Sequence, residues 1–436
     1  MQINYHKKVK PFDMTRPPRR QAWWTLPIIW SISFFFLKWL KVKILKINTK
    51  GLKPPYILLC NHMQFLDFLV SAIANFPYRI NNIVSIDGFN ISPFLLRAIG
   101  SIPKRKFIND LFLIKNINFV LRELKDIVGL YPEARYTFVG IPSILPESLG
   151  KMIKLSNYPV VLLKFKGHHL QLPAWAKKSR KVKLVTEMKQ ILTVSDIEKT
   201  SSVEINEIIR KAFEYNEYDY QKENNILIKE KYRAEGLHKV LYKCPDCNEE
   251  FEMDSKGAAI FCKKCNHSWT LKETGELESQ QGETKFSSIP EWYNWQRVEV
   301  RKEIENGAYT FAFTSQVYSM PHPKKFIDLG QASFKQDIKG IKVEGFYNGQ
   351  PFSYERKALD NYSIHVEYKF PYLKGKDIVS LSSNTDTLFF VPKETNKIQK
   401  LSLATEELYK YSKEQIGQRS QKSTVNQDLL ISDQCF

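Results

Sequence analysis

The chain has 436 residues, too many for one hydrophobic core, so we expect two or three domains. A hydrophobic fraction of 43% with 13% aromatic residues excludes a wholly disordered chain. The net charge of +19 is uneven: residues 1–200 hold 32 Lys and Arg against 11 Asp and Glu, and the remainder holds 33 against 35.

A basic excess confined to the first 200 residues favours an anionic partner there, such as nucleic acid, an anionic membrane face or a phosphorylated substrate. A lysine-rich solvated surface is the alternative. No cleavable signal peptide is recognisable at the N-terminus, so an oxidising compartment is not indicated. We therefore expect the chain on the cytosolic side.

A basic, proline-bearing segment over residues 1–24 precedes an apolar run over 26–37, which Lys38 interrupts. A helix that spans a bilayer needs about 20 apolar residues, and this run is shorter. Aromatic residues with flanking lysines are typical of a helix that lies in the headgroup zone. We predict an interfacial membrane helix over 26–45, with a buried core helix and a true span as the alternatives.

Short apolar runs of strand length occupy 56–60 and 159–165, and a helical pattern over 111–124 lies between them. Strands that alternate with helices favour an α/β layer architecture. We predict an α/β domain with a mixed sheet over 25–200, followed by a helical connector over 201–240.

Two CxxC pairs follow the connector. They are separated by fourteen residues, and their cysteines are Cys244, Cys247, Cys262 and Cys265. In a reducing compartment such pairs indicate metal binding, and four thiolates suit a closed tetrahedral Zn²⁺ site. We predict a structural zinc ribbon over 241–275, with an unloaded remnant or a redox pair as the alternatives.

The last part of the chain is β-rich. Ser288 and Glu291 form a capping-box pattern with an early proline, which predicts a helix ending near Asn306. Alternating aromatic and β-branched residues then predict strands to about residue 395, with a final helix near 403–413. We assign a helix plus β-rich domain to 285–413 and a flexible tail to 414–436. A pleckstrin-homology-like barrel has this size and closes with a helix, although other small β folds fit equally well.

The segment after the first apolar run carries Asn61, His62 and, five residues beyond the histidine, Asp67. Histidine accepts a proton from an alcohol near neutral pH, and a nearby carboxylate fixes its tautomer and stabilises the imidazolium. The two side chains can meet only if His62 lies at or just before the first helical turn. Taken alone, such a pair is more often a surface histidine with satisfied hydrogen bonds.

These three residues resemble the Asn-His-x4-Asp motif of the glycerophospholipid acyltransferase family, of the lysophosphatidate acyltransferase kind. Further segments are similar to the family's later motifs in the correct order, over about residues 25–195: 100–105, 131–137, 150–151 and 158–161. Three positions depart from the pattern. Ala134 replaces a glycine, Arg135 lies one position early, and Leu162 replaces the second proline of the last motif.

The resemblance implies that an acyl thioester, acyl-CoA or acylated carrier protein, transfers its acyl group to a hydroxyl of a lysophospholipid or glycerol-phosphate acceptor. His62 would be the general base and Asp67 its partner. The substrate-binding residues that the resemblance implies are Asn61, Lys104, Arg105, Glu133 and Arg135. It also implies an anionic membrane surface as a partner and a peripheral or monotopic place on the cytoplasmic face of a membrane.

A nucleic-acid-binding zinc-ribbon protein is the second hypothesis, motivated by the charge and the four cysteines. Such a ribbon should itself be basic, yet the basic excess lies upstream of residue 200. We therefore expect no nucleic acid as a partner. A catalytically altered member of the same family is the third hypothesis.

Overall fold

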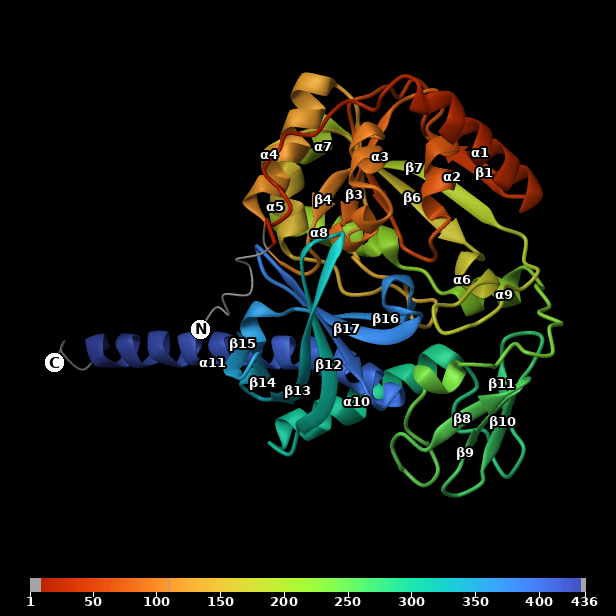
Figure 1. Cartoon of the computed structure of the whole chain (residues 1–436), viewed down its shortest axis with the longest axis vertical. Coiled ribbons are helices and arrows are strands. Elements are labelled where there is room, and N and C mark those ends of the chain that lie inside the picture. The colour runs from red at the N-terminus through yellow and green to blue at the C-terminus, as the bar shows by residue number, and fades with distance from the viewer. Residues whose placement is uncertain (1–8, 109, 433–436) are drawn as a thin grey trace.

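The computed structural model describes residues 9–108 and 110–432, and for 395 and 419–432 it describes the backbone alone. Figure 1 shows three parts: an α/β part formed by the first half of the chain, a second antiparallel sheet with two long helices, and a small ribbon beside it. Among the described residues, we find no helix with the length and apolar character that crossing a bilayer requires.

The α/β part is built on a seven-stranded sheet. Its strands, in spatial order, are β1 (Lys43–Ile47), β7 (Val185–Leu192), β6 (Val160–Lys166), β2 (Ile57–Cys60), β5 (Ile127–Leu130), β3 (Ile80–Ser85) and β4 (Ile102–Lys104). β6 and β7 pair antiparallel, and every other neighbouring pair is parallel. The predicted α/β architecture with a mixed sheet is confirmed.

Helices cover both faces of this sheet. They are α1 (Thr25–Trp39), α2 (Asp67–Ala74), α3 (Pro93–Ala98), α4 (Leu111–Phe119), α5 (Ser148–Ser156), α6 (His168–Gln171), α7 (Val194–Lys199) and α8 (Ser202–Phe213), with short turns η2 (Ile86–Asn90) and η3 (Val120–Leu124). Strand β2 is buried at every position. Because side chains alternate along a strand, Ile57 and Leu59 join one hydrophobic cluster, and Leu58 and Cys60 join the other.

Two expectations about the limits of this part differ from the structure. Helix α1 ends at Trp39, not at residue 45, because Lys41 adopts a left-handed conformation (φ 52°) and the chain then enters edge strand β1. Helix α8, expected in a connector, packs on α5. Gly150 allows this approach, since a Cβ there would lie 2.1 Å from the Ser202 carbonyl oxygen.

The ribbon follows α9 (Glu217–Glu223) and the short turn η4 (Leu237–Lys239). Its four antiparallel strands are β8 (Met253–Lys256), β9 (Ala259–Cys262), β10 (Ser268–Leu271) and β11 (Leu277–Ser279), in the order β11-β10-β9-β8. The last strand lies just beyond the predicted end of this module at residue 275.

The β-rich domain begins with α10 (Ile289–Glu305), whose capping box at Ser288 is present as predicted. Its antiparallel sheet has the order β15-β14-β13-β12-β18-β17-β16. The bounds are β12 (Thr310–His322), β13 (Lys325–Asp337), β14 (Gly340–Tyr347), β15 (Gln350–Lys357), β16 (His365–Phe370), β17 (Lys376–Ser382) and β18 (Thr387–Pro392), with short turns η5 (Ala358–Asp360), η6 (Pro371–Leu373) and η7 (Thr395–Lys397).

The final helix α11 (Ile398–Ser432) is longer than the sequence suggested. Residues 414–432, expected to form a flexible tail, continue the helix, and 433–436 lie outside the described residues. The extension contains no proline, and Gly417 is its one glycine, so backbone propensity does not stop the helix.

The β-rich domain packs against the edge of the α/β part that carries the family-like motifs. Ile86 shares a hydrophobic cluster with Met320, Phe370 and Phe389 from the β-rich sheet. In Figure 1 strands β12, β16 and β17 lie directly below the ends of β3 and β4. The site described next therefore lies between two domains.

Candidate active site

The carboxyl ends of β2, β5 and β6 meet at one edge of the sheet because these strands run parallel. His62 follows β2, the segment beginning at Tyr131 follows β5, and His168 follows β6. Ligands of open α/β sheets commonly bind at such an edge. The topology thus brings together residues that are about 100 positions apart in sequence.

His62 and Asp67 lie side by side at this edge. The Nδ1 atom of His62 is 3.5 Å from Oδ2 of Asp67, which is the first residue of α2. The same oxygen accepts hydrogen bonds from the backbone amides of Met63 (2.8 Å) and Gln64 (2.9 Å). These bonds fix the Asp67 carboxylate at the start of α2. His62 therefore lies just before the first helical turn, as it must for residues 62 and 67 to meet.

His168 completes this group from the opposite side. Its Nδ1 donates to the second oxygen of Asp67 at 3.0 Å, and its ring is fully buried in α6. Burial raises the pKa of Asp67, but the hydrogen bond from His168 and the nearby His62 ring outweigh this effect and lower the pKa below its usual value. Asp67 is therefore ionised at neutral pH and can stabilise positive charge on His62.

The His62 ring is held between two tyrosines, with centroid distances of 4.5 Å to Tyr131 and 4.3 Å to Tyr136. Its side chain keeps 22% of its surface exposed. Burial lowers the pKa of His62, although Asp67 opposes that shift. The imidazole is therefore neutral near pH 7, and because Nδ1 faces Asp67, Nε2 is the nitrogen left for a substrate.

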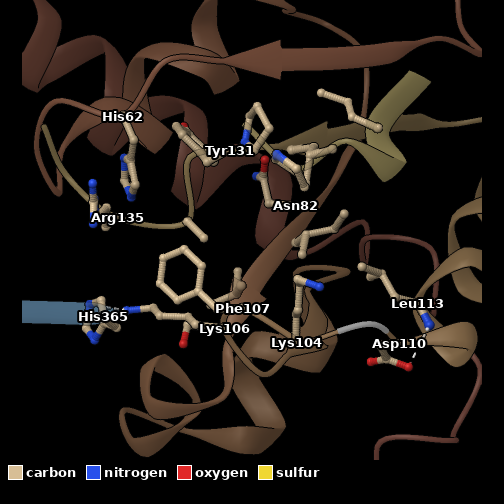
Figure 2. Close-up of a pocket in the computed structure, with 18 of the residues that line it drawn as sticks. His62, Asn82, Lys104, Lys106, Phe107, Asp110, Leu113, Tyr131, Arg135 and His365 are labelled. Atoms are coloured by element: carbon tan, nitrogen blue, oxygen red, sulfur yellow. Dashed lines mark hydrogen bonds between the residues drawn. The ribbon is translucent and has the colours of Figure 1, made fainter. Parts of the chain in front are cut away.

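A cavity of about 2020 Å³ opens in front of His62. Figure 2 shows His62 and Arg135 at one end, His365 of the β-rich domain nearby, and Lys106 extending toward His365. Lys104 lines the same cavity. Several exposed apolar side chains also line it: Trp24, Ile28, Ile32, Phe65, Ile91, Leu95 and Leu111. The cavity thus joins a polar end to an apolar rim.

Two of the predicted substrate-binding residues brace the backbone. The side chain of Asn61 exchanges hydrogen bonds with the backbone of Phe165 in β6, at 2.7 and 3.1 Å. Glu133 accepts from the amides of His62 (2.9 Å) and Ser143 (2.6 Å). Burial raises the pKa of Glu133 to about 7, against the effect of these two amides. Both side chains therefore position the loop that carries His62.

Arg105 points away from the cavity. Its guanidinium donates to the carbonyl oxygens of Met320, Pro321 and Thr385 and to the hydroxyl of Thr387, at 2.7 to 3.4 Å. Only 1% of the residue is exposed. Its expected contact with a substrate phosphate does not agree with this placement, because its terminal nitrogens already bind the β-rich domain.

Arg135 lines the cavity but is also bonded to the β-rich domain. It donates to Ser363 and Ser402, each at 3.0 Å, and forms a buried ion pair with Glu406 of α11. Arg135 and Arg297 lower the pKa of Glu406 to about 2, against the effect of burial. The neighbouring Ala134 has φ 55°, a left-handed backbone conformation that favours glycine.

The four ribbon cysteines form the predicted cluster. Their sulfurs lie within 4.8 Å of one another, with Cys244–Cys265 at 3.7 Å and Cys247–Cys262 at 3.8 Å. A tetrahedral Zn–S distance of about 2.3 Å places sulfurs about 3.8 Å apart, so the cluster fits a metal ion of this size. An all-thiolate shell has no open position, which suits a structural ion.

Sequence analysis missed His168, Lys106 and His365. His168 follows the strand predicted at 159–165, and the shared edge of parallel strands would have pointed to it. Lys106 lies in the turn that follows β4, so no periodic pattern indicated the direction of its side chain. No sequence pattern indicated His365, because its place depends on how two domains pack.

No family model matches this chain, and no curated protein matches it. Among solved structures, it is similar to the crystal structure of the 1-acyl-sn-glycerophosphate acyltransferase PlsC from Thermotoga maritima, with 13% sequence identity and a TM-score of 0.35. The match covers 44% of this chain and 78% of that chain. A similarity of this size carries no functional argument.

Proposed function

We propose that the protein is an acyltransferase of the glycerophospholipid type, which transfers a fatty acyl group from a thioester to a hydroxyl of a glycerol-phosphate or lysophospholipid acceptor. The observation that carries the proposal is a neutral His62 at the polar end of a large cavity with an apolar rim, with an ionised Asp67 3.5 Å from its Nδ1. The order of the family-like motifs in the sequence adds to it.

In the proposed reaction, Nε2 of His62 takes the proton of the acceptor hydroxyl as its oxygen attacks the thioester carbonyl carbon. The carbon–sulfur bond then breaks, and the thiolate that leaves receives the proton from the imidazolium. The products are an ester and a free thiol. Asp67 stabilises the imidazolium between these steps, and His168 holds Asp67 by its other oxygen.

The apolar rim supports a lipid substrate and a membrane surface as partner. Ile28 and Leu111, which are 51% and 82% exposed, lie at the starts of α1 and α4 and both line the cavity. Exposed apolar residues grouped at a cavity mouth indicate a surface that another apolar phase covers. Together with the basic excess of residues 1–200, they favour an anionic membrane face, which we propose to be the cytoplasmic one.

The remaining expectations stay proposals. We propose a structural zinc ion in the ribbon and either acyl-CoA or acylated carrier protein as the donor. The β-rich domain has seven antiparallel strands followed by a helix, which agrees with a pleckstrin-homology-like barrel in these two respects.

The test uses the purified full chain, radiolabelled acyl-CoA or acylated carrier protein, and a panel of lysophospholipids and sn-glycerol 3-phosphate. We expect labelled ester from at least one pair, loss of it in His62→Ala, and its retention in the control His322→Ala, whose ring lies outside the cavity. Transfer retained in His62→Ala would refute the mechanism. Absence of transfer with every pair would refute the function, and acceptor binding without transfer would then identify a catalytically altered protein.

A further inference from the structure

We propose that the protein binds a compact anion with two phosphate groups in a second hollow, which is lined by lysines from three parts of the chain. The inference goes beyond the proposed function and does not depend on it. The hollow is separate from the candidate active site, because no described residue lines both. Its ligand is either a soluble diphosphate or the headgroup of a lipid with two phosphates, and vesicle binding separates these two sources.

The second hollow has a volume of about 850 Å³, within the range of small-molecule sites. Five lysines and one aspartate line it, and its other lining residues are uncharged. The lysines come from the α/β part, from the segment before the ribbon and from the β-rich domain: Lys177 follows α6, Lys239 ends η4, Lys369 and Lys376 belong to β16 and β17, and Lys393 follows β18. The hollow therefore forms where these three parts of the chain meet.

A bulge in β16 turns Lys369 into this hollow. Side chains alternate along a strand, so Lys369 should share a face with His365 and Glu367, which line the candidate active site. The pairing of β16 with β17 shifts register between Glu367 and Phe370, and Lys369 has a left-handed backbone (φ 58°). Phe370 consequently lines the candidate active site, and Lys369 lines the second hollow. A left-handed conformation is uncommon for lysine, and bulges often re-aim a side chain near a functional site.

Asp377, the one acidic residue of the hollow, already has a cationic partner. This buried carboxylate accepts from the backbone amide of Lys369 at 2.9 Å and forms an ion pair with Lys239. The Lys239 ammonium also lies 5.3 Å from the centre of the Tyr368 ring. Asp377 therefore fixes the bulge and neutralises one lysine, and the other lysines of the hollow stay uncompensated.

Four of the five lysines form no ion pair with any described residue. Lys177, Lys376 and Lys393 are exposed at the edge of the hollow. The Lys369 ammonium is half-buried and donates to the carbonyl oxygen of Ala176, a neutral acceptor. All four ammonium groups therefore keep donors for an anionic ligand.

The uncompensated charge indicates the class of ligand. Burial lowers the pKa of Lys369, and the charges of Lys239 and Lys177 lower it further, although Asp377 opposes them. These cations thus repel one another, and a bound anion relieves the repulsion. A phosphate monoester carries a charge of about −1.5 to −2 at neutral pH, so two phosphate groups balance four lysines. A single carboxylate would leave most of this charge uncompensated.

Titration calorimetry of the full chain with pyrophosphate, and with inorganic phosphate as the single-phosphate probe, tests the site without relying on activity. We expect pyrophosphate to bind more tightly than phosphate. The double variant Lys376→Met with Lys393→Met should weaken pyrophosphate binding by about 10- to 100-fold, because each lysine supplies a charge-assisted hydrogen bond. Both lysines are exposed, so their replacement should not disturb folding. Lys335→Met with Lys342→Met is the matched control, since it removes the same charge from exposed positions of the same domain outside the hollow.

Vesicle binding identifies the source of the two phosphates. The protein is sedimented with phosphatidylcholine vesicles that contain cardiolipin, a lipid with two phosphates, in the presence and absence of pyrophosphate. A bound fraction that falls in the Lys376 and Lys393 double variant but not in the control, and that pyrophosphate displaces, assigns the site to a lipid headgroup. Site-dependent pyrophosphate binding without these effects assigns it to a soluble ligand.

Three results would overturn the inference. The first is that neither pyrophosphate nor cardiolipin binds, or that pyrophosphate binds the double variant as tightly as wild type. The second is an equal loss of affinity in the control, which would reduce the effect to net charge. The third is equal affinity for phosphate and pyrophosphate, which would exclude a ligand with two phosphates. None of these measurements requires acyl transfer, so failure of the proposed function would leave the site standing.

Discussion

Replacing Asp67 with asparagine tests the central electrostatic claim. The amide has the size of the carboxyl group, and its oxygen can still accept from the amides of Met63 and Gln64. Asp67→Asn therefore removes a charge while it leaves the local fold largely intact.

The size of the effect follows from the distance. A unit charge 3.5 Å from the imidazolium stabilises it by roughly 4–5 kcal/mol at an effective dielectric constant of about 20. Loss of half to all of this stabilisation slows the chemical step by about 30-fold to 5 × 10³-fold. Because Asp67 raises the pKa of His62, its loss should also shift the acid limb of the pH–rate profile to lower pH.

The assay follows thiol release from the donor thioester in a single turnover across pH. The control is Asp219→Asn, an exposed carboxylate of α9 outside the cavity. A folded Asp67→Asn protein with a rate within about threefold of wild type would refute the argument. An equal loss in the Asp219→Asn control would do the same.

Two further outcomes follow from the ribbon and from a buried carboxyl. Purified protein should hold one zinc ion per chain. Chelation or Cys262→Ser should increase backbone hydrogen exchange over residues 244–271, because the metal holds the ribbon together. A metal-free chain with the same protection from exchange would contradict this prediction. Burial raises the pKa of Glu217 to about 8 from 4.5, so its stabilising contribution is complete below pH 4.5 and is lost as pH rises toward 8. The free energy of unfolding, measured with urea, should fall between pH 5 and pH 9 by on the order of 4 kcal/mol less in Glu217→Gln than in wild type. An equal fall in both proteins would refute the raised pKa of Glu217.

The features that sequence analysis placed well depend on local patterns. The strand and helix periodicities gave the mixed sheet, and the capping box at Ser288 gave the start of α10. The cysteine spacing gave the cluster in the ribbon. The His62–Asp67 pair came from a motif whose spacing the helix start at Asp67 now explains.

The features that sequence analysis misplaced depend on contacts between residues that are far apart in the sequence. Arg105 matched a family motif, but its direction follows from the carbonyl groups that another domain brings to it. The same packing places His365 beside Lys106. Local periodicity contains no information about which domain surface will cover a strand end, so neither contact was predictable.

The bonds of Arg105 and Arg135 have a practical consequence for how this protein can be divided. A truncated chain ending near residue 240 would keep the whole first sheet, yet both guanidinium groups would lose most of their partners, and Ile86 would lose the apolar side chains that cover it. Such a fragment would expose an apolar patch and uncompensated charge where the intact chain has an interior. Its failure to transfer acyl groups would say little about the proposed function, because residues from the second half of the chain form one wall of the cavity.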